Sequence, residues 1–147
     1  MNKKKVDSYL KNAVAVLEKT KIVEEKKIEK GYRRQISTFG ASVTMGSILS
    51  AVACFSEQGK ANVNRSKLMA AIYLLLKNEK LKEYNEELKE YYGKKDPDKK
   101  DPDKNYSNKL FEYVKDNYPD NAVTVKEEIL EAAVALKLAM NLYELKK

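Results

Sequence analysis

ISTFGASVTMGSILSAVACF, residues 36–55, contains no charged side chain, although 35% of all residues in this 147-residue chain are charged. We expect so apolar a segment to be buried as one helix that ends near Gln58, before Gly59. Glycine, serine and threonine residues dilute its hydropathy, which favours a buried helix of a water-soluble protein over a membrane span. The bulky face of this helix is expected to hold Phe39, Val43, Leu49, Val52 and Phe55.

Apolar residues recur at helical spacing through most of the remaining chain. A first helix is expected to run to about Lys30 and to end at Gly31, since glycine readily adopts the conformation that ends helices. Asn64 is the expected N-cap of a later helix, because its side chain can accept free backbone N–H groups. The last helix is marked by Thr124 and Glu127, which fit a capping box. Two further helices are expected over residues 81–91, before a stop at Gly93, and over residues 106–114.

These patterns predict an all-α fold, a compact helical bundle of about five to six helices in a single domain over residues 1–147. The sequence KDPDKKDPDK, residues 95–104, repeats a five-residue unit whose Asp-Pro steps and alternating charges cannot continue a helix. We therefore expect an exposed, flexible loop over about residues 93–105. Because its charges cancel, we expect no binding role for it.

The composition excludes several kinds of chemistry. The chain has no histidine, which rules out a histidine general base, a histidine-ligated metal and a Ser-His-Asp triad. No glycine-rich phosphate loop or metal-binding aspartate cluster is present, and we expect neither catalysis nor a cofactor. The single cysteine, Cys54, is expected to be buried in the uncharged stretch. With no disulfide possible within the chain, and no apolar segment after the basic start MNKKKVDSYL, we expect a cytoplasmic protein.

Positive charge is concentrated in the first half of the chain. Residues 1–76 hold 14 Lys and Arg against 6 Asp and Glu, whereas residues 77–147 hold 15 against 16. An excess of one sign attracts partners of the other. The sequence therefore predicts a nucleic acid or an acidic protein face as partner, with a merely soluble lysine-rich surface as the alternative.

Two basic groups flank the uncharged stretch. Arg33 and Arg34 are expected at a corner between two helices, where each guanidinium group could hold two phosphate oxygens. Salt bridges to another subunit and plain solvent exposure are the alternatives. Lys60, Arg65 and Lys67 follow the stretch. A straight helix over residues 36–58, rising 1.5 Å per residue, would separate the two groups by roughly 30 Å.

Smaller features near these groups have two interpretations each. Tyr32 could stack on a base, or its ring could cover the helical corner. Ser42, Gly46 and Ser50 recur every four residues and predict a smooth seam. An internal helix contact is the favoured interpretation of this seam, and a binding groove is the alternative.

One part of the chain, between residues 28 and 76, resembles a known family. The similarity is carried by GYR at residues 31–33, ISTFGASV at 36–43, GSIL at 46–49, AVACF at 51–55 and RSKL at 65–68. These segments resemble the small helical subunit of type III-B CRISPR effector complexes, the Cmr family. That family typically has a tyrosine-rich or basic turn, a Ser-Phe-Gly entry, a Gly-x-Leu step and an Ala-Phe stretch. The match covers about a third of the chain.

The resemblance implies a subunit without enzymatic activity in an antiviral, RNA-guided complex. Several copies would stack in a row beside the backbone subunits that carry the guide RNA, and their basic surfaces would line the target RNA. Charge and position select the candidate RNA-binding residues, which are Arg33, Arg34, Lys60, Arg65 and Lys67, with Lys27 and Lys30 as secondary candidates. The main alternative is a protein-only scaffold subunit that contacts other subunits without touching RNA. A regulator that binds duplex DNA is disfavoured, because no helix combines a suitable basic face with helix-turn-helix spacing.

Overall fold

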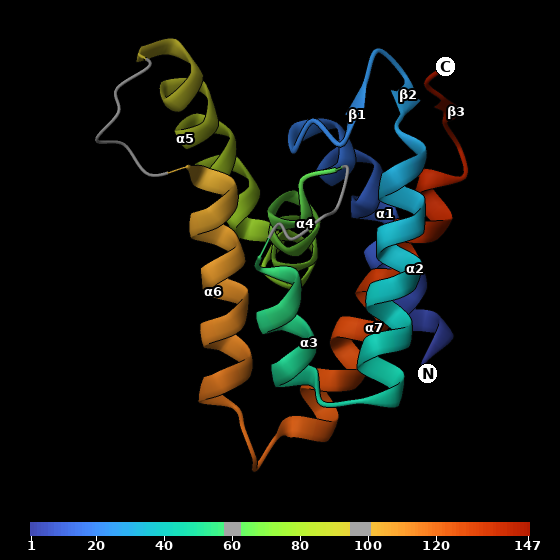
Figure 1. Cartoon of the computed structure of the whole chain (residues 1–147), viewed down its shortest axis with the longest axis vertical. Helices are drawn as coiled ribbons and strands as arrows, with labels where there is room; N and C mark the ends of the chain where they lie inside the picture. Colours follow the sequence, from blue (N-terminus) through green and yellow to red (C-terminus); the bar gives the residue numbers. More distant parts are fainter. Residues whose placement is uncertain (58–62, 95–100) are drawn as a thin grey trace.

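The computed structural model describes residues 1–57, 63–94 and 101–147. Within these residues the chain forms seven α-helices, one 3-10 turn and three two-residue strands (Figure 1). The helices are α1 (Lys3–Lys19), α2 (Lys30–Met45), α3 (Ile48–Phe55), α4 (Arg65–Leu76), α5 (Leu81–Lys94), α6 (Pro102–Asp116) and α7 (Ala122–Met140). The 3-10 turn is η1 (Asn78–Lys80), and the strands are β1 (Val23–Glu24), β2 (Lys27–Ile28) and β3 (Glu144–Leu145). The mostly helical fold is as predicted, whereas the small sheet and the larger number of helices are not.

Helix α4 lies at the centre of the bundle because it is apolar on nearly all sides. Seven of its twelve residues are buried, and a helix of this kind is stable only when other elements cover it. Helices α1, α6 and α7 pack against it, and α1 also packs along α7 (Figure 1). The helix begins as predicted, since Oδ1 of Asn64 accepts the backbone N–H of Lys67 at 3.3 Å.

The uncharged stretch forms two helices rather than the single helix expected. Helix α2 ends at Gly46, whose backbone is extended, with φ −135° and ψ −156°. Ser47 then caps α3, its Oγ accepting the backbone N–H of Ser50 at 3.4 Å. Helix α3 runs back beside α2 (Figure 1), and the rings of Phe39 and Phe55 meet edge to face, with centroids 5.2 Å apart. The two ends of the stretch are therefore brought together instead of being held apart.

Burial of this stretch is limited to one face of each helix. Phe39, Val43, Val52 and Phe55 are buried as predicted, while Leu49 is only partly buried. The opposite faces are exposed, and Met45 keeps 87% of its surface accessible. The exposed part of this surface is formed by Ser37, Thr38, Ala41, Thr44, Met45, Ser50, Ala53 and Cys54, which we call the uncharged face.

Two expectations about the uncharged stretch are wrong. Cys54 is exposed rather than buried, and Ser42, Gly46 and Ser50 form no continuous seam, because Ser50 lies on a different helix from Ser42. The hydroxyl groups of α2 bond back to their own helix, as Thr44 does when its Oγ1 donates to the carbonyl of Gly40 at 2.9 Å. These hydroxyl groups are therefore satisfied within the helix itself.

The first helix ends at Lys19, well before the position predicted. The chain continues as an antiparallel hairpin, in which Val23 pairs with Ile28 and Glu24 pairs with Lys27. Strand β3 then adds to β2 in parallel, and the backbone N–H of Lys146 donates to the carbonyl of Ile28 at 2.9 Å. The end of the chain is thereby fixed beside the hairpin.

Gly31 lies inside the first turn of α2 and does not end a helix. Its small size has another role, because a Cβ atom at this position would lie 2.7 Å from Cγ1 of Val63. The glycine therefore allows the segment before α4 to pack closely against the start of α2.

Both described ends of the segment 93–105, for which a loop was expected, are helical or cap a helix. Gly93 lies within α5, and residues 95–100 lie outside the described residues. The second repeat unit instead begins α6: Asp101 is the N-cap, its carboxylate accepting the backbone N–H of Asp103 at 3.0 Å, and Pro102 is the first helical residue. Proline is favoured at the first helical position because a backbone N–H there would have no partner within the helix, so its absence costs nothing. Asp103 is only 2% exposed and accepts a hydrogen bond from the hydroxyl of Tyr84.

The predicted capping box of the last helix is not formed. Helix α7 begins at Ala122, so Thr124 lies in its first turn rather than before it. Asn121 is the N-cap residue and makes no side-chain capping bond. A turn precedes the helix instead, in which the backbone N–H of Ala122 donates to the carbonyl of Pro119 at 3.2 Å.

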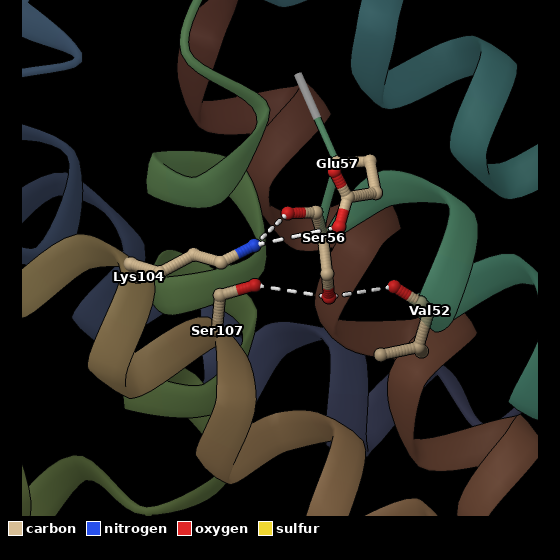
Figure 2. A network of polar contacts seen from close by, with 5 residues as sticks. All are labelled: Val52, Ser56, Glu57, Lys104 and Ser107. Atoms are coloured by element: carbon tan, nitrogen blue, oxygen red, sulfur yellow. Dashed lines mark hydrogen bonds and ion pairs between the residues drawn. The ribbon is translucent and has the colours of Figure 1, made fainter. Parts of the chain in front are cut away.

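A polar network joins the end of α3 to α6 (Figure 2). The ammonium group of Lys104 donates to the carbonyl of Ser56 at 2.6 Å and lies 3.9 Å from the carboxylate of Glu57. The hydroxyl of Ser107 donates to that of Ser56 at 3.1 Å, and Ser56 in turn donates to the carbonyl of Val52 at 2.8 Å. These contacts satisfy buried polar groups at the end of α3 and fix it against α6.

None of the helices in the described parts of the chain combines the length and the apolar character needed to cross a bilayer.

The buried Asp103 carboxyl should make stability depend on pH. Burial raises its pKa above the ordinary value, although the hydrogen bond from Tyr84 and the charge of Lys67 oppose the rise. Because the unfolded chain ionises more readily, the folded state loses stability as pH rises from about 4 through the raised pKa. Replacing Asp103→Asn should remove this loss. In urea unfolding between about pH 4 and pH 7, the variant should therefore gain stability relative to the unmodified protein as pH rises.

The exposed Asp116 at the end of α6 provides the matched control. Asp116→Asn should leave the shape of the pH profile unchanged. A stability difference between Asp103→Asn and the unmodified protein that does not vary with pH would contradict the prediction.

Candidate nucleic-acid interface

Basic residues occupy the starts of α2 and α4, where a helix already presents partial positive charge. Lys30, Arg33 and Arg34 lie in α2, and Arg65 and Lys67 lie in α4. No acidic residue lies within either first turn, although the N-cap residue of α2 is Glu29. This is the reverse of the usual preference for Asp and Glu at helix N-termini. An anion bound beside these turns would be attracted both by the side chains and by the helix ends.

Arg33 points toward the carboxyl end of α7. Its Nη2 donates to the carbonyl oxygens of Met140 and Tyr143, at 2.9 and 2.7 Å. Unpaired carbonyl groups at a helix end carry partial negative charge, so a cation is favourable there. The guanidinium group that the sequence suggested for phosphate binding is thus already engaged with the protein backbone.

Lys30 and Arg34 are exposed and line a depression of about 430 Å³ at the start of α2. Gly31 and Val63 form part of its lining. The same depression is lined by Lys146 and Lys147, which follow β3. Two sequence-predicted residues are therefore brought together with two lysines from the other end of the described chain.

Lys27 lines a neighbouring depression that shares Lys146 and Lys147 with the first. We call Lys27, Lys30, Arg34, Lys146 and Lys147 the hairpin cluster. Glu24, Glu25 and Glu29 lie among these cations, so the side chains of this region carry a net charge of +2.

Lys146 is held in place by the carboxylates around it. Its ammonium group lies 3.7 Å from the carboxylate of Glu24 and 3.9 Å from that of Glu29. Exposed ion pairs of this kind contribute little to stability, so their effect here is to orient the lysine. No sequence signal marked Lys146 or Lys147, because a strand of two residues is too short to show a period.

Arg65 lies close to the start of α2 rather than roughly 30 Å away as the straight-helix estimate required. Its Nε donates to the side-chain oxygen of Gln35 at 3.0 Å, and its guanidinium carbon lies 4.3 Å from the centre of the Phe55 ring. The reversal between α2 and α3 accounts for this proximity. Lys67 is half-buried, and its charge lowers the pKa of the buried Asp103 carboxyl of α6. It therefore has a different electrostatic partner from Arg65.

The remaining sequence candidates fall outside this arrangement. Lys60 lies outside the described residues. Tyr32 is only 7% exposed, so its ring covers the interior and is not available to stack on a base. Burial raises the pKa of Tyr32 to about 12, which keeps its hydroxyl neutral.

The chemistry available at the hairpin cluster is that of anion binding. Lysines offer point charges with three donors each, and Arg34 offers a planar fork that matches phosphate oxygens. Within residues 1–57, 63–94 and 101–147, no three Cys, Asp or Glu side chains are grouped so as to hold a metal ion.

Comparison of the chain with protein-family models, with curated proteins and with solved structures found no match.

The internal role of Arg33 should be visible in stability measurements. Arg33→Ala removes two charge-assisted hydrogen bonds to the end of α7, and bonds to charged groups are worth about 1.5–3 kcal/mol. We expect urea unfolding to show a decrease in stability of about that size. Arg34→Ala, one residue along and exposed, should change stability by less than about 0.5 kcal/mol. Equal effects of the two substitutions would show that the contact with α7 contributes nothing specific.

Proposed function

We propose that this protein is a non-catalytic subunit of an RNA-guided antiviral complex, and that it binds an RNA backbone without reading its sequence. The observation that carries the proposal is the hairpin cluster, in which cations from β2, α2 and the segment after β3 gather around two adjoining depressions. The resemblance of residues 28–76 to the small subunit of type III-B complexes supports the same assignment.

Each cation of the cluster has a suitable role. Arg34 would hold two oxygens of one phosphate, and Lys27, Lys30 and Lys147 would supply exposed charge on either side. Lys146, oriented by its ion pairs, would hold its ammonium group at the boundary of the two depressions. Arg33 would act indirectly, as a positioning residue that fixes the end of α7.

The character of the cluster favours backbone contact over base recognition. Its side chains are cations and carboxylates, and the neighbouring aromatic ring, that of Tyr32, is buried. Phosphate contacts of this kind fix position and carry no sequence information. The partners proposed are target RNA, the subunits that carry the guide RNA, and further copies of this chain. Weak contacts in each copy would add up when several copies line one strand.

The test is a charge reversal at the cluster. In the Lys30→Glu and Arg34→Glu double variant, affinity for single-stranded RNA should fall for every sequence alike. The slope of log K against log salt concentration should also shrink by about 0.7 for each phosphate that the variant no longer neutralises. Filter binding or fluorescence anisotropy at several salt concentrations measures both quantities.

A control with the same change in charge is available on α5 and α6. The exposed Lys82 and Lys115 can be changed to Glu together, and RNA affinity should then decrease less, with a nearly unchanged salt slope. If the two double variants bind RNA equally well, the hairpin cluster is not the RNA-binding surface.

A second candidate function, a protein-only scaffold subunit, is favoured by the uncharged face of α2 and α3. Met45 is 87% exposed on this face, and an apolar depression of about 200 Å³ between α2 and α7 adjoins it, lined in part by Ala41 and Thr44. Uncharged surface of this kind suits contact with another subunit better than contact with a polyanion.

The scaffold function predicts that a charge on this face blocks assembly. Met45→Glu should reduce co-purification with the other subunits of the complex, because a carboxylate would be buried at the interface. Val123→Glu, an equally drastic change at a residue 74% exposed on α7, serves as the control. Normal assembly of Met45→Glu would remove this face from consideration, and photo-crosslinks from target RNA to the hairpin cluster would favour the RNA-binding function.

A further inference from the structure

A second basic depression lies between the end of α1 and one face of α5. It has a volume of about 540 Å³, within the size range of small-molecule sites. From α5 it is lined by Asn85, Leu88, Lys89 and Tyr92, whose spacing of three and four residues places them on one helical face. Leu88 is buried and forms an apolar floor.

Positive charge predominates around this depression. Lys19, Lys21 and Lys89 line it, and no ion pair involves any of them among the described residues. The single carboxylate, that of Glu18, accepts a hydrogen bond from the hydroxyl of Tyr143 at 3.4 Å. Three exposed lysines and one glutamate therefore line this space.

An aromatic ring is exposed beside these lysines. Tyr92 keeps 49% of its surface accessible, and the edge-to-face contact with Tyr91 supports its ring, with centroids 5.5 Å apart. The ammonium group of Lys21 lies 4.5 Å from the centre of the ring. Lys21 has φ 64°, a backbone conformation unfavourable for residues other than glycine. The turn after α1 thus adopts a strained conformation that directs a cation onto the ring, and strain of this kind is often found at functional sites.

A series of depressions connects this one to the hairpin cluster. The depression beside α5 shares Glu18 with one under the hairpin. That one shares Glu25 and Lys27 with the depression beside β3, which leads to Lys146 and Arg34 at the start of α2. The depression beside α5 is thus linked to the hairpin cluster through shared lining residues.

We infer that the depression between α1 and α5 binds one unpaired nucleotide of the RNA strand whose backbone lies along the hairpin cluster. This inference rests on the proposed function and extends it to single-stranded RNA, because a base within a duplex would first have to be unpaired and unstacked before it could reach Tyr92. The base stacks on the Tyr92 ring, Lys21 moves from the ring to the adjoining phosphate, and Lys19 and Lys89 supply further charge. Asn85 offers both a donor and an acceptor to the edge of the base. An acidic peptide would use the lysines but would leave the exposed ring unused.

The test uses the full chain and two labelled probes. One is an oligouridylate of roughly 12 nucleotides, a length in the range that single-strand-binding domains occupy, and the other is an abasic ribose-phosphate strand of the same length. Tyr92→Leu should weaken binding of the oligouridylate at least about 5-fold, the lower limit for one stacked base. It should leave binding of the abasic strand unchanged. Tyr92→Phe should bind both probes as the unmodified protein does, because the ring is kept.

Tyr118 provides the matched control, since it is 53% exposed and lies beyond the end of α6. Tyr118→Leu should bind both probes normally, and thermal unfolding of Tyr92→Leu checks that the variant is folded. The inference is overturned if Tyr92→Leu binds the oligouridylate normally, or if its affinity for both probes falls equally.

The charge reversal at Lys30 and Arg34 separates this inference from the function on which it rests. If that double variant binds both probes more weakly while Tyr92→Leu binds normally, the backbone interface stands and the nucleotide site is wrong. If Tyr92→Leu binds only the oligouridylate more weakly while the charge reversal has no effect, the nucleotide site stands and the proposed role of the hairpin cluster is wrong.

Discussion

The contact between Arg33 and the end of α7 is the interaction on which the candidate interface depends. The guanidinium group joins two segments more than one hundred residues apart in the sequence. By holding the carbonyl groups of Met140, the last residue of α7, and of Tyr143 beyond it, the guanidinium group sets the direction in which the chain leaves that helix. Strand β3 can then pair with β2, and the lysines that follow it reach the depression beside Arg34. One internal arginine thus organises a surface made of other cations.

Much of the helical core could be predicted from local sequence, because its signals are local. The apolar run in α4 requires burial, and the Asn64 cap acts within three residues. The short strands could not be predicted, since two residues show no alternation and their pairing depends on the position of α7. The capping motif at Thr124 gave a wrong start for the last helix. Helix α7 begins at Ala122, two residues earlier, directly after a turn.

The uncharged stretch shows that a lack of charge is not the same as burial. Phe39 and Phe55 do enter the core. Ser37, Thr38 and Thr44 instead bond to carbonyl groups one turn earlier and remain at the surface. The break at Gly46 could not be predicted from the sequence, because glycine and serine recur throughout the uncharged stretch and occur both within helices and at their ends. This break overturned the estimate of a separation of roughly 30 Å, since it brought Arg65 to the side of α2, where it donates to Gln35. The role of Arg33 could not be read from its charge, because its partners are backbone atoms supplied by a distant helix.

The exposure of Cys54 on α3 has a practical consequence for spectroscopic studies of this protein. It is the only cysteine in the chain and its side chain is accessible. A maleimide dye or a nitroxide spin label can therefore be attached at one defined place without first removing other thiols. The label would sit on the opposite face of α3 from the buried Val52 and Phe55. From there it would report rotation and distance changes while leaving the packed interior undisturbed.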